Sequence, residues 1–324
     1  MKPNLIRRQL ALLGLALCCS SALAQGSYPD KPIRIVVPFA PGGGTDVLTR
    51  IVAQQMAENM KAQIVVDNRP GGGGSLGTGL AAKSPPDGYT LFVGTNATAM
   101  MPALSKGLNF DPIGDFVPIA LIGSSPFLLV VNNKVGVSSV PELLAMARAK
   151  PGSLSYGSAG NGSVNHVGME LFKSMAQVDI LHVPYKGSSA ALADLLGGQI
   201  TMMMDTIVSS AQHVKTGAVK ALAVTSQEKS SLTPNIPTVA EQAIKGFDVT
   251  VWYGFVAPKG TPPAILQRLN AEVNKALANP AVRARYEKLG AEPVSSTLES
   301  FGQLWVAEEK KWTQVIRTAG IRSE

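Results

Sequence analysis

The chain has 324 residues, of which 45% are hydrophobic and 16% are charged, enough apolar material for one large or two medium-sized domains. Three of its 29 basic residues, Lys2, Arg7 and Arg8, lie at the very start, which leaves 26 basic against 22 acidic residues in the remainder. This small excess forms no run rich in lysine or arginine. Nucleic acid is therefore excluded as an expected partner.

The N-terminal residues have the composition of a secretory signal peptide. Their basic start is followed by an apolar run at 10–19 and then by Ala22-Leu23-Ala24, which fits a small-residue cleavage site. We therefore expect residues 1–24 to be removed and the mature protein to act in the periplasm.

Both cysteines of the chain, Cys18 and Cys19, lie within this segment. Lipid attachment to one of them is the alternative to plain cleavage, but it requires a small residue before the cysteine, and Leu17 is large. Cleavage after Ala24 leaves a mature protein without disulfides, thiol catalysis or cysteine metal sites. No later apolar stretch has the length of a membrane helix.

Beyond residue 30, short apolar runs alternate with helical patterns, which predicts an α/β fold with mainly parallel sheets. Strands are expected at 33–37, 64–66, 89–94, 126–132, 181–185, 200–205, 219–225 and 249–256. Helices are expected from Thr45, at 76–82, from Pro141 to 149, after 163, at 190–196, from Pro262, at 281–289 and at 298–318.

Two glycine-rich turns each link a predicted strand to a predicted helix. The first is Pro38-Phe39-Ala40-Pro41-Gly42-Gly43-Gly44-Thr45-Asp46 and the second is Ser158-Ala159-Gly160-Asn161-Gly162-Ser163. Glycine lets the backbone approach a ligand closely, and the unpaired N–H groups of a helix start favour an anion. Two such turns could hold one small anion between them. Neither contains a nucleophile with its base, which favours capture over chemistry.

Motifs for catalysis or for a cofactor are not recognisable. The first turn lacks the lysine of a phosphate-binding loop, and 71–79 lacks the strand and acidic partner of a dinucleotide site. The three histidines have no metal-ligand spacing, and Gly160-Asn161-Gly162-Ser163 is not a nucleophile elbow. We predict no catalytic residue, metal or cofactor, although a Ser–His–acid triad defined only by geometry stays open.

Several motifs occur in an order that resembles the Bug family, the periplasmic substrate-binding proteins of tripartite tricarboxylate transporters. Besides the two turns they are Tyr28-Pro29-Asp30-Lys31-Pro32-Ile33-Arg34, Asp67-Asn68-Arg69-Pro70-Gly71-Gly72, Pro86-Asp87-Gly88-Tyr89-Thr90-Leu91, Val183-Pro184-Tyr185-Lys186-Gly187 and Leu195-Leu196-Gly197-Gly198-Gln199. The resemblance covers nearly all of the mature chain. It implies a receptor, not an enzyme, that captures a small organic acid and delivers it to the transporter's membrane subunits, and we expect it to be a monomer.

The resemblance also implies a two-lobed binding protein of the second periplasmic class, with a ligand cleft between the lobes. Each lobe would be a mainly parallel sheet flanked by helices. Lobe one would comprise residues 25–131 and 249–324, and lobe two residues 132–248. The lobes would close on the ligand.

Candidate ligand-binding residues lie in the two turns and at the ends of predicted strands. They are Phe39, Pro41, Gly42, Gly43, Thr45, Thr95, Asn96, Ser158, Ala159, Gly160, Asn161, His166 and Asp205. Structural roles remain open for several of them: Thr45 as a helix cap, His166 as a packed side chain, and Asp205 as a partner for a neighbouring loop. Asp46 is expected to be a structural charge at a helix start.

Two other functions remain open. An enzyme for a small carboxylic acid could use a similar two-lobed fold, and a receptor could feed a two-component sensor instead of a transporter. Asn161 and Asn165 depart from the serine-rich run of many relatives, so the ligand cannot be copied from one of them.

Overall fold

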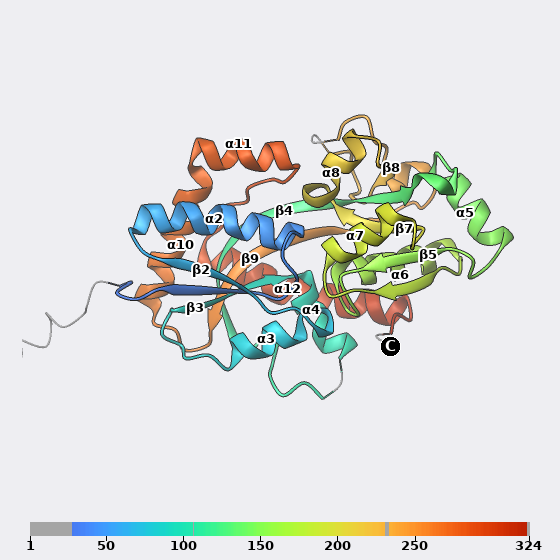
Figure 1. The fold of residues 1–324 in the computed structure, drawn as a ribbon. Helices are drawn as coiled ribbons and strands as arrows, with labels where there is room; N and C mark the ends of the chain where they lie inside the picture. The colour runs from blue at the N-terminus through green and yellow to red at the C-terminus, as the bar shows by residue number, and fades with distance from the viewer. Residues whose placement is uncertain (1–27, 106, 231–232, 323–324) are drawn as a thin grey trace, which may run out of the picture.

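The computed structural model describes residues 28–105, 107–230 and 233–322, so the expected signal peptide lies outside the described residues. Strands and helices alternate along the chain and form two lobes side by side (Figure 1), which confirms the α/β class. Within the described part of the chain, no helix combines the length and apolar character needed to cross a membrane.

The first lobe is built on a sheet with the strand order β2-β1-β3-β9-β4. Its parallel strands are β1 (Ile33–Val37), β2 (Ile64–Asn68) and β3 (Thr90–Thr95), and β9 (Thr250–Pro258) runs antiparallel to β3. Helices α2 (Gly44–Met60), α10 (Pro263–Ala278) and α11 (Pro280–Leu289) pack together on one side. Helices α3 (Ser75–Ala82), α4 (Asn96–Leu104) and α12 (Leu298–Thr318) pack on the other.

The second lobe is built on β6 (Leu181–Pro184), β5 (Ser155–Ser158), β7 (Met202–Thr206), β4 (Phe116–Asn132) and β8 (Val219–Val224). Strand β5 is parallel to both β6 and β7, whereas β4 is antiparallel to β7 and β8. The helices of this lobe are α5 (Val140–Ala149), α6 (Val164–Ala176), α7 (Ser188–Gly197), α8 (Ile207–Lys215) and α9 (Val239–Gln242).

The long strand β4 joins the two lobes. Its residues up to Pro126 pair with β9, and from Phe127 onward they pair with β7 and β8. Strand β9 returns beside it in the opposite direction. The expectation of mainly parallel sheets therefore needs correction: the outer three strands of each sheet are parallel, and the crossing strands add antiparallel pairs because one leaves the first lobe while the other re-enters it.

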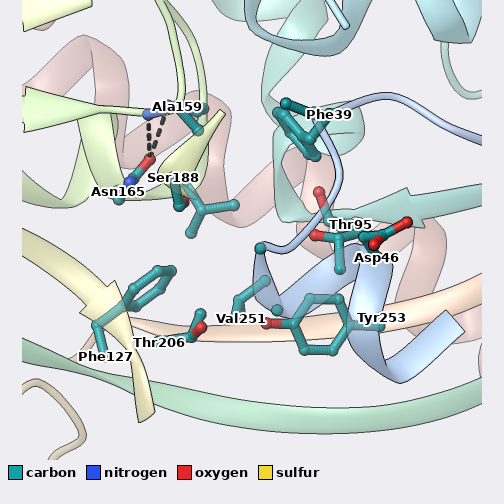
Figure 2. A pocket seen from close by; sticks show the side chains of 16 residues that line it. Phe39, Asp46, Thr95, Phe127, Ala159, Asn165, Ser188, Thr206, Val251 and Tyr253 are labelled. Carbon is teal, nitrogen blue, oxygen red and sulfur yellow. Dashed lines mark hydrogen bonds between the residues drawn. The ribbon is translucent and has the colours of Figure 1, made fainter. Parts of the chain in front are cut away.

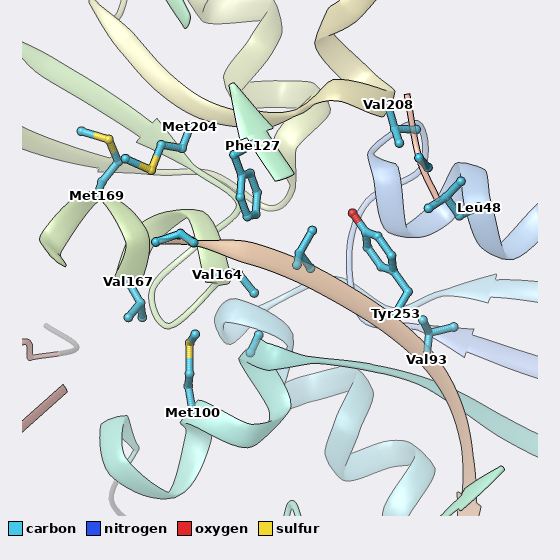
Figure 3. Close-up of a cluster of buried hydrophobic side chains, with 14 of the residues drawn as sticks. Leu48, Val93, Met100, Phe127, Val164, Val167, Met169, Met204, Val208 and Tyr253 are labelled. Atoms are coloured by element: carbon cyan, nitrogen blue, oxygen red, sulfur yellow. The ribbon is translucent and has the colours of Figure 1, made fainter. Parts of the chain in front are cut away.

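A continuous buried apolar cluster runs through both lobes (Figure 3) and fixes the strands relative to one another. It includes Leu48 and Val93 from the first lobe and Val167 and Met204 from the second. The ring of Tyr253 belongs to the same cluster, so its backbone and ring are held while its hydroxyl lies at the edge of the cluster.

Candidate functional site

A cavity of about 40 Å³ lies between the lobes, against the roughly 10–15 Å³ that one water molecule needs. Residues from both lobes and from the crossing strands β4 and β9 line it (Figure 2): Phe39, Ala40, Gly43, Gly44, Thr45, Asp46 and Thr95 from the first lobe, Ala159, Ser163, Val164, Asn165, Ser188 and Thr206 from the second, and Phe127, Val251 and Tyr253 from the crossing strands. The cavity lies at the carboxyl ends of the parallel strands, where α/β proteins bind ligands.

Helix N-termini converge on this cavity. Strands β1, β5, β6 and β7 lead into α2, α6, α7 and α8, and the first residues of each of these helices or its N-cap are among the lining residues. None of these four helices has a side-chain cap, although α5, α9, α11 and α12 elsewhere are capped by serine, threonine or asparagine. Their first N–H groups are therefore available to an anion, and the helix dipoles favour negative charge there.

Glycine is required at the turns that lead into these helices. Gly42 has a φ of +89° and Gly160 a φ of +118°, a backbone conformation that residues with a Cβ rarely adopt. Gly44 has an ordinary φ but no space: an ideal Cβ there would lie 2.7 Å from Thr206 Oγ1 and 3.0 Å from Tyr253 Oη. The glycine-rich sequence thus brings the start of α2 against two hydroxyl groups.

Two buried side-chain donors face the cavity without a hydrogen-bond partner among the described residues. The side chain of Asn165 is 3% exposed; its Oδ1 accepts from Ala159 N and from Ser163 Oγ, and its Nδ2 has no partner. Tyr253 is 1% exposed, and its hydroxyl makes no hydrogen bond of normal geometry. A buried polar group without a partner is unfavourable, so both groups are suited to a polar ligand (Figure 2).

The charges of the site favour an anion held by neutral donors. None of the lining residues is lysine or arginine. Asp46 lines the cavity, but Gly42 N, Asn68 Nδ2 and Arg50 all donate to its carboxylate, at 2.9–3.0 Å. Burial raises the pKa of Asp46, but these hydrogen bonds outweigh it and hold the pKa below its usual value. Its charge is thus already compensated, as expected for a structural residue at a helix start.

Five residues predicted from the sequence line the cavity: Phe39, Gly43, Thr45, Thr95 and Ala159. Thr45 lies in the first turn of α2 rather than at its cap, which is Gly43. Thr95 caps α4 by accepting from Ala97 N. Their contact with a ligand stays a prediction.

Three other predicted residues have structural partners instead. Asn96 donates to Glu308 Oε2 at 2.6 Å and accepts from Trp252 N at 3.0 Å, which ties α4 to α12 and β9. Ser158 Oγ lies 2.6 Å from His182 Nε2 and accepts from Gly160 N. His166 Nδ1 accepts from Gly162 N at 3.0 Å, and its ring stacks on His182.

The remaining predicted residues lie beside the cavity but do not line it. The carbonyl of Pro41 accepts from Ser189 Oγ across the lobes, Gly42 binds Asp46, and Gly160 and Asn161 line a separate hollow with Tyr185 and Lys186. Asp205 is fully buried at the end of β7, and its Oδ2 accepts from Ser209 Oγ. Burial raises the pKa of Asp205 to about 7.

Sequence reasoning missed several lining residues: Phe127, Asn165, Ser188, Thr206, Val251 and Tyr253. Ser188 and Thr206 could have been found, because Thr206 directly follows the predicted strand 200–205 and Ser188 lies just beyond the predicted strand 181–185, before the predicted helix 190–196. For Tyr253 the sequence allows both a cleft wall and the more common core position, because the inward and outward positions of the long crossing strand depend on its pairing. No group of three or more histidine, cysteine or acidic residues within the described ranges is arranged to hold a metal ion.

Comparison with known proteins agrees with this geometry. The family described as "Tripartite tricarboxylate transporter family receptor" matches residues 48–321. A UPF0065 protein in the tcbD-tcbE intergenic region of Pseudomonas sp. (strain P51) is 40% identical over 96% of this chain and 93% of its own length. Protein BugT of Bordetella pertussis is 35% identical over 97% of this chain and 98% of its own.

Solved structures give the same result at the level of the fold. Rpa4515 of R. palustris with adipate superimposes with a TM-score of 0.88 at 34% identity, covering 91% of this chain and 99% of that one. MatC of Rhodopseudomonas palustris with bound malate gives 0.86 at 34% identity, covering 89% and 100%. The periplasmic binding protein BugD gives 0.88 at 32%, covering 91% and 100%.

These matches confirm the two-lobed binding-protein fold and the resemblance to the Bug proteins, and they identify relatives that are solute receptors rather than enzymes. The chain belongs to the tripartite tricarboxylate transporter receptor family.

Proposed function

We propose that this protein captures a small organic acid, with one or more carboxylates, in the cavity between its lobes and delivers it to a tripartite tricarboxylate-type transporter. The observation that carries the proposal is the convergence of four helix N-termini without side-chain caps on one cavity. Relatives that hold adipate or malate support the same ligand class.

Each lobe contributes part of the anion site. In the first lobe, the N–H groups at the start of α2 would hold a carboxylate beside the Tyr253 hydroxyl. In the second, the start of α6 with Asn165 Nδ2, and the starts of α7 and α8, would hold another carboxylate or a hydroxyl. Phe39, Phe127 and Val251 supply the apolar wall for the carbon chain between them. A ligand that bridges the lobes would stabilise the closed arrangement.

We infer the location, the oligomeric state and the partners of the receptor from its family and its N-terminal sequence. We propose export to the periplasm by cleavage after Ala24, action as a monomer, and docking of the loaded protein on the transporter's membrane subunits. We also propose lobe one as residues 25–131 and 249–324 and lobe two as 132–248, with movement about the crossing strands β4 and β9.

A thermal-shift screen against organic acids tests the proposal, because a ligand that binds only the folded state raises its stability. We expect one or more small carboxylates to raise the midpoint of unfolding, and mass spectrometry to recover the bound acid unchanged. No shift with any acid would contradict capture, and catalytic conversion of a bound acid would favour the enzyme alternative.

A further inference from the structure

Three hydroxyl groups form a row that ends at the wall of the cavity. Ser209 Oγ donates to Asp205 Oδ2, and Ser209 Oγ lies 3.2 Å from Thr206 Oγ1. Thr206 lines the cavity, and the Tyr253 hydroxyl extends toward the same part of it (Figure 2). The row thus connects a buried carboxyl group to the space where a ligand would lie.

The hydrogen atoms in this row have a defined direction. A serine hydroxyl has a single proton, and above the pKa of Asp205, which is about 7, the ionised carboxylate accepts the proton of Ser209. Ser209 therefore accepts from Thr206 in their shared hydrogen bond. The Thr206 hydroxyl donates its single proton to Ser209. A lone pair on the Thr206 oxygen remains available to a group in the cavity. Thr206 acts as an acceptor.

The Tyr253 hydroxyl has the complementary property. Burial, with the nearby Asp205 carboxyl, raises the pKa of this phenol above its usual value, so it keeps its proton. The neighbouring Thr206 hydroxyl lowers this pKa, but less than burial raises it, and the Tyr253 hydroxyl makes no hydrogen bond of normal geometry to a described residue. Tyr253 is therefore able to donate to a group in the cavity.

The acceptor and the donor lie side by side at the start of α2. The two oxygens lie 2.7 Å and 3.0 Å from one point, the position of an ideal Cβ on Gly44. We propose that Thr206 and Tyr253 together recognise a hydroxyl group close to the ligand's carboxylate, so that the preferred ligand is a hydroxy acid. This inference rests on the proposed function, in which the start of α2 holds that carboxylate.

Among the hydroxyl, methylene, carboxylate and ammonium groups of small organic acids, the hydroxyl group satisfies both partners. It accepts from Tyr253 and donates to Thr206, whereas a methylene group leaves both without a ligand partner. A carboxylate oxygen has no proton to donate, so its lone pairs would face those of the Thr206 oxygen. An ammonium group could donate to Thr206 but could not accept from Tyr253. A site built to bond a substrate hydroxyl discriminates strongly against an analogue without it.

Titration calorimetry on pairs of acids that differ only in one hydroxyl tests the inference. The pairs are L-malate with succinate and citrate with tricarballylate, with L-aspartate as the amino analogue of malate. We expect the hydroxy acid of the pair that fits the cavity to bind about tenfold or more tightly than its partner, since one buried donor and one acceptor lose their bonds otherwise.

Variants assign the preference to the hydroxyl row. Thr206→Val keeps the shape of the side chain but removes the acceptor, so the ratio of the two affinities falls, although Tyr253 can still donate to the ligand hydroxyl, and Thr206→Ser restores it. Ser209→Ala lowers the ratio as well, because Thr206 is then free to turn its proton into the cavity; Ser209 is a positioning residue. Thr216→Val, beyond the far end of α8, leaves the ratio unchanged.

The outcomes separate the two proposals. Binding of both members of a pair with equal affinity, tighter binding of aspartate than of malate, or a preference that is undiminished in Thr206→Val overturns the hydroxyl inference and leaves the receptor proposal standing. If no acid in a broad screen binds, the proposed function fails, and the hydroxyl inference fails with it.

Discussion

At the scale of single residues, the second glycine turn shows that neighbouring asparagines have different tasks. Asn165 lines the cavity with its amide nitrogen unpartnered, while its oxygen is fixed by Ala159 N and Ser163 Oγ. Asn161, which the sequence indicated as the ligand residue, lies in a separate hollow beside Lys186. Both are close to the same glycines, so the sequence alone could not tell which side chain points inward.

The change Asn165→Asp tests this assignment. It replaces the NH₂ group with an oxygen of nearly the same shape, removes a donor and adds a negative charge next to the bound anion. We expect the affinity for the ligand acid to fall about a hundredfold or more, as measured by calorimetry. Asn161→Asp adds the same charge outside the cavity, and we expect it to change the affinity much less. Equal losses in the two variants would show that the orientation is wrong.

The stacked histidines give a second prediction at this scale. Burial lowers the pKa of His166 to about 4, and burial together with His166 lowers that of His182 to about 4. The unfolded chain, with a histidine pKa near 6.5, binds more protons between pH 6.5 and 4, so the free energy of unfolding falls as the pH is lowered through this range. Asp205, whose raised pKa acts in the opposite sense, is present in parent and variant alike.

Thermal unfolding of His182→Gln at pH 7.5, 6 and 5 isolates this contribution. Glutamine can still bond Ser158 but does not titrate. We expect a smaller drop in the midpoint between pH 7.5 and 5 than in the parent. The same drop in both proteins would mean that the histidine is not a source of the pH dependence.

At the scale of elements, the most predictable parts were those whose sequence pattern is local. The strand β1, the helix α12 and the proline at the start of α5 were all evident from residue spacing. Helix α8 was missed because Ile207 follows β7 without a turn residue, and α4 because it is apolar on most sides and contains Pro102. The first half of β4 was missed because Gly123-Ser124-Ser125-Pro126 has the composition of a loop, and only pairing with β9 makes it a strand.

The start of α2 allows a test with two neighbouring glycines. Gly44→Ala places a methyl group 2.7 Å from Thr206 Oγ1, so Thr206 and Tyr253 must shift and binding should weaken at least about tenfold. Gly43→Ala meets only Ser188 Cβ at an ordinary 3.8 Å, and its φ of −78° suits alanine. We therefore expect Gly43→Ala to affect calorimetric affinity less. A reversed order would place the close contact elsewhere.

At the scale of the whole molecule, the lobes meet through direct bonds at the edge of the cavity. Ala40 N donates to Lys186 O at 3.3 Å, and Ser189 Oγ donates to Pro41 O at 2.9 Å. Gly73 also packs against the carbonyl of Asn161, where an ideal Cβ would be only 1.7 Å from the oxygen. These contacts join the two lobes at the edge of the cavity, and closure of the lobes on a ligand stays a prediction from the family resemblance.

Ser189→Ala removes one of these hydrogen bonds between the lobes without altering the cavity wall. We expect the ligand to dissociate roughly two- to tenfold faster, because one hydrogen bond that forms on closure is lost. Ser153→Ala, which removes a bond within the second lobe, to Lys150 O, is the matched control and should leave the rate unchanged. Stopped-flow measurement of tryptophan emission follows release, and equal rates for Ser189→Ala and the parent would exclude a role in closure.

The central claim is that convergent helix starts hold a carboxylate without lysine or arginine. Calorimetric titration with L-malate and adipate, each paired with its uncharged diamide, tests it most directly. We predict one binding site per chain, heat with one or both acids, and binding of the corresponding diamide that is at least about a hundredfold weaker, since each carboxylate loses charge-assisted hydrogen bonds. Equal affinity for acid and diamide, or no binding of any small carboxylate, would contradict it.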